Sequence, residues 1–293
     1  MFPLADRDLL ALDDLPPDQL IAILERAVEL ARLWTARRMP QSLAGRRLAL
    51  VVNDGGWRNT SAFDLGIQAM GGLCVQAPLR LDQREAVADL GAYLDNWFDA
   101  VVCRAPALST LRALADAAVA PVINARTRQN HPCEVLGDLA WYAQRHGGIG
   151  GITVAVLAPE ANILGSWVEA AAVLPLQVIQ VYPERWHLRG AGRHAAFRAT
   201  ADLAALQEAQ IIVTDCWPEG VAAGDDTLLR YQVSASLLAR LRPDTEFLPC
   251  PPVTRGQEVT ADAMQHPSCR AVPAKAFLLH AQNALLEWAF GRF

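Results

Sequence analysis

The chain has 293 residues, of which 52% are hydrophobic and 19% charged, with a formal net charge of −5. This length and composition allow two hydrophobic cores, and the mixed charges form no basic stripe, which argues against a nucleic-acid partner. Residues 1–7 meet charge at Asp6 before any apolar run, so we expect no signal peptide. No apolar stretch reaches membrane-spanning length. We therefore expect a cytoplasmic protein without a membrane partner.

The cysteines show no paired spacing along the chain, because they stand at positions 74, 103, 133, 216, 250 and 269. Scattered cysteines are typical of reduced thiols in a cytosolic protein, and a disulfide framework or zinc site needs closer pairs. We expect no metal site and no cofactor.

Apolar runs rich in β-branched residues alternate with helix-like runs throughout. The pattern predicts strands at residues 47–52, 73–76, 100–103, 119–124, 152–158, 176–182, 211–214 and 245–249. It predicts helices at residues 17–36, 60–70, 85–97, 107–117, 133–145, 163–173, 202–208, 233–239 and 276–290. Short buried strands between helices are typical of parallel sheets covered on both faces. We therefore predict an α/β fold of two doubly wound parallel-sheet domains with an interdomain cleft.

A glycine-rich stretch, residues 146–151, divides the strands evenly. These glycines precede a strand instead of following one, so they indicate a hinge and not a dinucleotide-binding loop. We expect one domain to comprise residues 1–146 with a returning C-terminal helix at 276–293. Residues 147–275 would form the other domain.

Polar residues follow the predicted strands at the ends where ligands of open parallel sheets bind. They are residues 54–59, Arg104, His131, Asn162, Asp215 and residues 250–252. Any one of them is more often a cap or turn residue, but together they favour a site in the predicted cleft.

Several motifs, in order along the chain, resemble one family. They are Asp8-Leu9-Leu10, Phe63-Asp64-Leu65-Gly66, Val101-Val102-Cys103-Arg104, His131-Pro132-Cys133-Glu134 with Asp138, Thr214-Asp215-Cys216-Trp217, Leu248-Pro249-Cys250-Pro251-Pro252, Arg255-Gly256-Gln257-Glu258-Val259-Thr260 and Leu279-His280-Ala281-Gln282. The chain resembles the aspartate/ornithine carbamoyltransferases, in their ornithine branch, over nearly its whole length. The resemblance implies carbamoyl transfer from carbamoyl phosphate without a covalent intermediate.

The resemblance also implies roles for residues of the first domain. Arg58 matches the arginine of the family's phosphate loop, and Asn59 stands at the following threonine. Arg104 resembles the arginine that bridges phosphate and carbonyl oxygen, and His131 resembles the histidine that donates to that oxygen. Glu134 stands where a glutamine contacts the carbamoyl group. The alternatives are a surface ion pair for Arg58 and a helix cap for His131.

In the second domain, Asn162 and Asp215 match residues that hold the α-amino and α-carboxylate groups of ornithine. Cys250 and Pro251 belong to the segment whose carbonyl groups face the carbamoyl group. Asp215 could instead be a strand-end cap, and Cys250 a small buried hydrophobe. The peptide bond between Pro251 and Pro252 is predicted to be cis, like the equivalent bond in the family.

Some positions depart from the family pattern, above all in the phosphate loop. Gly56 and Trp57 replace a serine and a threonine, Leu278 stands at the family's third arginine, and Pro218-Glu219-Gly220 replaces Ser-Met-Gly. We therefore predict that Trp57 occupies part of the phosphate space. We also predict that Arg104 and His131 point into one cleft, within reach of one anion.

The leading hypothesis is a carbamoyltransferase that uses carbamoyl phosphate and an ornithine-like amino acid. The family implies a homotrimer with active sites at subunit boundaries. A catalytically degenerate paralogue that binds a small ligand or a partner subunit is the alternative, and a transferase with a different donor is a third.

Overall fold

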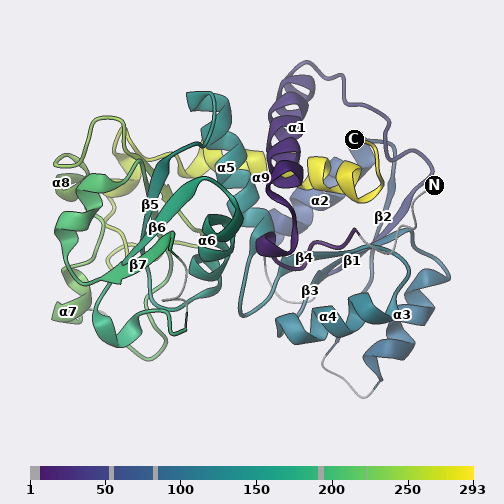
Figure 1. Cartoon of the computed structure of the whole chain (residues 1–293), viewed down its shortest axis with the longest axis horizontal. Coiled ribbons are helices and arrows are strands. Elements are labelled where there is room, and N and C mark those ends of the chain that lie inside the picture. The colour runs from purple at the N-terminus through teal and green to yellow at the C-terminus, as the bar shows by residue number, and fades with distance from the viewer. Residues whose placement is uncertain (1–6, 53–55, 82–84, 191–194, 223) are drawn as a thin grey trace. The chain divides into compact units, whose positions relative to one another are not determined.

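A computed structural model of the chain describes residues 7–52, 56–81, 85–190, 195–222 and 224–293. Residues 1–6, which contribute to the expected absence of a signal peptide, lie outside this set. The chain forms two compact units (Figure 1). Unit 1 comprises Met1–Gly147 and Ala276–Phe293, and unit 2 comprises Gly148–Lys275.

Unit 1 is built on a four-stranded parallel sheet in the order β2-β1-β3-β4. Its strands are β1 (Arg47–Val51), β2 (Leu73–Gln76), β3 (Ala100–Arg104) and β4 (Val122–Arg126). Its helices are α1 (Pro17–Thr35), α2 (Trp57–Ala69), α3 (Val87–Asp95), α4 (Leu108–Ala117), α5 (Pro132–His146) and most of α9 (Ala271–Ala289).

Helices cover both faces of this sheet, and α3 and α4 lie together on one of them (Figure 1). On that face Ala49, Val101 and Val122 pack with Leu90 of α3 and Leu111 of α4. Alternate strand residues point to the opposite face, where α1, α2 and α5 lie. Burial on both faces explains why the central strands β1 and β3 are apolar over most of their length.

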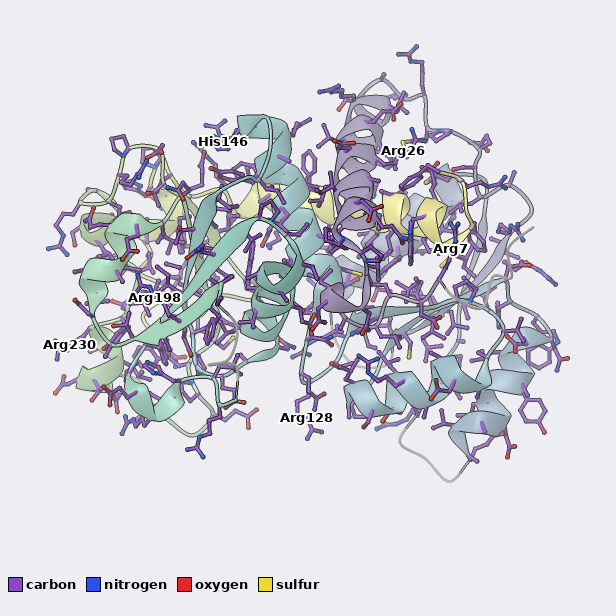
Figure 2. The ribbon with its side chains drawn as sticks, in the orientation of Figure 1. Arg7, Arg26, Arg128, His146, Arg198 and Arg230 are labelled. Atoms are coloured by element: carbon purple, nitrogen blue, oxygen red, sulfur yellow. The ribbon has the colours of Figure 1, made fainter. Side chains whose placement is uncertain are left out.

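The N-terminal segment and α9 complete unit 1. Leu9 pairs with Ile123 beside β4, so the segment extends the sheet at that edge. The Nη1 atom of Arg7 donates to the Trp288 carbonyl at 2.5 Å, and Arg26 bonds the carboxylate of Glu287 at 2.5 and 3.0 Å. Both arginines are labelled in Figure 2. The buried Glu287 carboxylate raises the pKa of Arg26.

Unit 2 is built on a five-stranded parallel sheet in the order β7-β6-β5-β8-β9. Its strands are β5 (Ile152–Leu157), β6 (Leu176–Val181), β7 (Phe197–Thr200), β8 (Ile211–Thr214) and β9 (Glu246–Pro249). Its α-helices are α6 (Asn162–Val173), α7 (Asp226–Leu229) and α8 (Ala235–Leu238). One sheet face packs against Leu206, Leu228 and Leu238, which come from a 3-10 helix and the two short helices.

The predicted α/β class with two parallel-sheet domains is confirmed. Every predicted strand is present within a few residues of its predicted bounds, but β7 and α7 were not predicted. The predicted helix at 202–208 is a 3-10 helix, Leu203–Glu208, and α9 begins at Ala271 instead of residue 276. No helix among the described residues is long and apolar enough to cross a membrane.

Candidate active site

The first loop of the candidate site leads from β1 into α2. Gly56 is the N-cap of α2 and has a left-handed backbone (φ 71°, ψ 34°), without a side-chain cap. The free N–H groups at a helix start favour an anion. The residues before it, including Asp54, which was expected to belong to the site, lie outside the described part of the chain.

Arg104 reaches this helix start from the end of β3. A Cβ atom on Gly56 would lie 1.4 Å from Nη1 of Arg104, so the guanidinium occupies the place that a side chain would take. Two positive groups, the guanidinium and the helix N-terminus, thus lie side by side. Their proximity is electrostatically favourable when an anion lies between them.

Trp57 and Arg58 form the first turn of α2. The indole of Trp57 is 67% exposed, and the Arg58 guanidinium carbon lies 5.0 Å from its ring centroid. The indole therefore lacks the apolar surroundings that the sequence analysis assumed, and its place relative to the phosphate stays a prediction. A cation over the ring gives the exposed indole a partner that needs no pocket.

The side chain of Asn59 points into the interior of unit 1 and not towards the surface of the loop. Its side chain is buried, its Nδ2 donates to the Ala125 carbonyl at 3.0 Å, and its Oδ1 accepts from Gln282 Nε2 at 2.6 Å. These bonds join α2 to β4 and α9. The contacts correct the substrate-binding role predicted for Asn59, since both ends of its amide are already engaged.

The second loop leads from β4 into α5. His131 is the N-cap of α5 and is followed by Pro132 at the first helical position. The carbonyl of His131 accepts from the Glu134 N–H at 3.2 Å, and His131 Nε2 lies 3.9 Å from Glu134 Oε2. The carboxylate of Glu134 is buried in the first turn of α5, where the helix dipole favours a negative charge.

Cys133 follows in the same helix turn. Its Sγ donates to the Asn124 carbonyl at 3.3 Å, and complete burial raises the pKa of its thiol. A thiol with a raised pKa is a poor nucleophile, so Cys133 is a structural residue.

Arg104 ends β3, and His131 follows the loop after the neighbouring strand β4. Arg104 pairs with Arg126 at the end of β4, five residues before His131. Their common reach to one anion stays a prediction, as does the interdomain cleft.

Unit 2 carries Asn162, Asp215, Cys250 and Pro251 at the carboxyl edge of its sheet. Asn162 opens α6 after β5, and Asp215 follows β8, which pairs with β5. Cys250 follows β9 and donates its N–H to the Thr214 carbonyl at 2.9 Å. The ends of three adjacent strands therefore collect these residues.

The segment after β9 has the backbone predicted for it. The bond between Pro251 and Pro252 is cis, which confirms the prediction. The carbonyl of Pro252 accepts from Cys216 Sγ at 3.6 Å. Burial and the neighbouring Asp215 and Glu258 raise the pKa of Cys216 to about 11. The thiol is therefore neutral near pH 7.

Comparison with known proteins matches both units to one family. The domain described as "Aspartate/ornithine carbamoyltransferase, carbamoyl-P binding domain" matches residues 7–144. The domain described as "Aspartate/ornithine carbamoyltransferase, Asp/Orn binding domain" matches residues 150–289. The chain belongs to the aspartate/ornithine carbamoyltransferase family.

Relatives of this family resemble the chain over nearly its full length. An ornithine carbamoyltransferase from Rhodopseudomonas palustris is 32% identical over 98% of each chain, and one from Brucella suis is 33% identical over 94% of this chain and 93% of its own. The crystal structure of ornithine carbamoyltransferase from Burkholderia thailandensis aligns with a TM-score of 0.88 and 27% identity, over 98% of this chain and 100% of its own. The Pyrococcus furiosus enzyme aligns over all of both chains, also at 0.88 and 27%.

The family assignment separates the candidate residues by domain. Arg58, Arg104, His131 and Glu134 fall in the carbamoyl-P binding domain, and Asn162, Asp215, Cys250 and Pro251 fall in the Asp/Orn binding domain. No group of three or more histidine, cysteine or acidic residues within the described ranges could hold a metal ion.

Two features of the site were not predicted from the sequence. One is the space that Gly56 leaves for Arg104, which follows only from the approach of two strand ends. The other is a set of buried amides before His131. Two asparagines around a strand end, Asn124 and Asn130, were the available signal for it.

Proposed function

We propose that this carbamoyltransferase transfers the carbamoyl group of carbamoyl phosphate to the amine of ornithine or a closely related amino acid. The observation that carries the proposal is the approach of Arg104 to the N-terminus of α2, in a chain matched by both carbamoyltransferase domains. A guanidinium beside a helix start is suited to a phosphate group.

In the proposed reaction, the neutral amine attacks the carbamoyl carbon. A C–N bond forms, the C–O bond to phosphate breaks, and phosphate leaves with the bonding electrons while the amine loses a proton. His131 donates a hydrogen bond to the carbamoyl oxygen as negative charge develops there, and Arg104 neutralises the phosphate. Fixed donors of this kind stabilise the transition state without a covalent step.

Arg58 is the outer phosphate ligand in this proposal, and Glu134 accepts from the carbamoyl NH2. Asn162 and Asp215 would together hold the α-amino and α-carboxylate groups of the acceptor. Cys250 and Pro251 would present backbone carbonyls to the carbamoyl NH2. The position of these four residues on one sheet edge supports this assignment.

We further propose a cytoplasmic homotrimer, from the family resemblance. The comparisons lend no support to the catalytically degenerate alternative, and they favour ornithine among the acceptors, because the curated relatives and aligned structures cited above are ornithine carbamoyltransferases. Light scattering after gel filtration would measure the molar mass, which should be that of three chains.

A steady-state assay tests the function. Purified protein is mixed with carbamoyl phosphate and one amino acid at a time, namely ornithine, aspartate, lysine and Nα-acetylornithine. Both released phosphate and the carbamoylated product are measured. We expect turnover with ornithine or an ornithine-like acceptor and none with aspartate. Phosphate release at the rate of spontaneous carbamoyl phosphate decay with every acceptor would contradict the proposal.

A further inference from the structure

A network of buried amides joins the N-terminal segment to the loop before α5. Asn130 Oδ1 accepts from Thr127 Oγ1 at 2.6 Å and from Asn124 Nδ2 at 2.7 Å. Its Nδ2 donates to the Leu10 carbonyl at 2.9 Å, and Asn124 Nδ2 donates to the same carbonyl at 2.7 Å. Asn124 and Asn130 are completely buried. A single backbone oxygen of the N-terminal segment thus accepts from both amides.

The same network fixes the backbone immediately before His131. The Thr127 N–H donates to the Asn130 carbonyl at 2.8 Å, and the Asn130 N–H donates to Thr127 Oγ1 at 3.1 Å. On the other side, the first turn of α5 holds the His131 carbonyl through the Glu134 N–H. The backbone of His131 is therefore held from both directions, which sets the direction of its Cα–Cβ bond and so limits where the imidazole can point.

Burial of these amides has a cost that an apolar side chain would avoid. A buried amide without partners loses its hydration, whereas a bonded one specifies a single conformation. The side-chain amide of Asn130 meets partners from the N-terminal segment (Leu10), from β4 (Asn124) and from its own loop (Thr127). These hydrogen bonds fix the conformation of Asn130, the residue that precedes His131.

We infer that Asn130 is a positioning residue for His131 and that it ties the N-terminal segment to the active site through the Leu10 carbonyl. The inference rests on the proposed function only in the role given to His131. Asn130 itself touches no substrate and acts through the loop that it holds.

The experiment compares Asn130→Ala with Gln180→Ala. Gln180 is an equally buried amide in unit 2 that donates to the Ala158 and Trp186 carbonyls and accepts from the Leu188 N–H. Both variants lose a bonded amide and should lose thermal stability. Only Asn130→Ala should disturb His131.

Two readouts separate positioning from a loss of stability. In protein labelled with [13Cε1]-histidine, the His131 resonance is assigned by its absence in His131→Gln, and its shift and titration curve are measured. Asn130→Ala should move this resonance and its midpoint, with the other histidines unmoved. In steady state, kcat should fall by about 10- to 100-fold, since a misplacement near 1 Å has that effect, while the KM for carbamoyl phosphate changes little.

Two less disruptive substitutions at Thr127 provide the same test if Asn130→Ala does not fold. Thr127→Val removes the hydroxyl that bonds Asn130 and keeps the shape, whereas Thr127→Ser keeps the hydroxyl. The valine variant should move the His131 resonance, and the serine variant should restore it.

An unmoved His131 resonance in both Asn130→Ala and Thr127→Val would overturn the inference. So would an equal change of kcat in Gln180→Ala. If the wild type catalyses no carbamoyl transfer while Asn130→Ala still moves the His131 resonance, the proposed function fails and the positioning role stands.

Discussion

The two loops that open α2 and α5 hold their functional groups in opposite ways. The first loop, at Gly56–Arg58, has a left-handed glycine and an exposed tryptophan. The second loop, at Thr127–His131, is fixed by buried hydrogen bonds on both sides of its histidine. Both loops connect a strand of the same sheet to a long helix, so their architecture does not explain the difference.

The difference follows the chemistry proposed for each loop. A hydrogen bond to a developing oxyanion needs a donor that is already in place, because reorganisation adds to the barrier. A dianionic phosphate binds over a longer range and tolerates a guanidinium on a flexible side chain. We therefore expect changes in the second loop to affect kcat, and changes in the first loop to affect KM.

Replacement of His131 should give the largest effect. His131→Asn keeps a donor of shorter reach and should lower kcat by about 100-fold or more, as removal of one oxyanion donor does. The KM for carbamoyl phosphate should change by less than about threefold, because the lost hydrogen bond strengthens only in the transition state. Steady-state kinetics with both substrates measure this. A rise of KM with unchanged kcat would place His131 in ground-state binding and break the comparison.

A side chain at position 56 should give the next largest effect. Gly56→Ala places a Cβ atom where Arg104 Nη1 lies, so the guanidinium must leave the start of α2. Loss of a hydrogen bond between charged groups costs roughly 1.5–3 kcal/mol, which corresponds to about a 10- to 100-fold higher Kd for inorganic phosphate. Titration calorimetry measures the change.

Gly45→Ala is the matched control for this substitution. Gly45 has a similar backbone (φ 77°), but its Cβ atom would meet no atom within 4 Å. Both variants carry the same left-handed strain, on the order of 1–2 kcal/mol, and only one displaces Arg104. Tighter phosphate binding in Gly56→Ala would mean that Arg104 competes with the anion, and would reverse the role given to it.

Acid should lower the stability of unit 1 through His280 of α9, the helix whose Gln282 bonds Asn59 of α2. Burial lowers the pKa of His280 to about 4, whereas an unfolded histidine titrates near 6.5. The unfolded state therefore binds a proton first, and stability falls as the pH drops from about 6.5 towards 4. Between pH 7 and 5.5 the loss should be on the order of 1 kcal/mol.

Chemical unfolding of wild type and His280→Leu at the two pH values measures this contribution. The leucine fits the apolar contacts with Trp34 and Phe277 and cannot titrate. The variant should lose less stability than the wild type on acidification. An equal loss in both proteins would assign the acid sensitivity to other groups.

Removal of the exposed indole should have the smallest effect. Trp57→Ala should change the KM for carbamoyl phosphate by less than about threefold, because a single exposed cation–π contact with Arg58 contributes about 0.5–1 kcal/mol. An increase of tenfold or more would show that the indole closes over the bound phosphate.

Apolar periodicity predicted the fold because both sheets are parallel and their central strands are mostly buried, so these strands are predominantly apolar in sequence. Strand β7 escaped prediction because Phe197-Arg198-Ala199-Thr200 is a short edge strand with a mostly exposed surface. The short helix α7 lacks the length that makes a 3.6-residue period visible.

For the candidate site, strand ends and family motifs located Arg104, His131 and the cis Pro251–Pro252 bond. The sequence could not assign the interior partners. Asn59 follows an arginine of the loop motif, yet its amide turns inward to Ala125 and Gln282. Trp57 is bulky and apolar, yet Arg58 stabilises it at the surface. The Asn59 bonds join segments that are distant in the chain, and the Trp57 contact depends on a side-chain orientation that the sequence does not specify.

The return of α9 to unit 1 has a consequence for biosynthesis. Unit 2 is one continuous stretch, Gly148–Lys275, whereas unit 1 needs Ala276–Phe293 to cover α1 and α2. During translation, all of unit 2 leaves the ribosome before the last helix of unit 1 does. Unit 2 can therefore fold before unit 1 is complete. Until α9 is synthesised, the apolar surface of unit 1 that α9 covers stays exposed. Nascent chains stalled before residue 276 should therefore depend on chaperones for the solubility of unit 1.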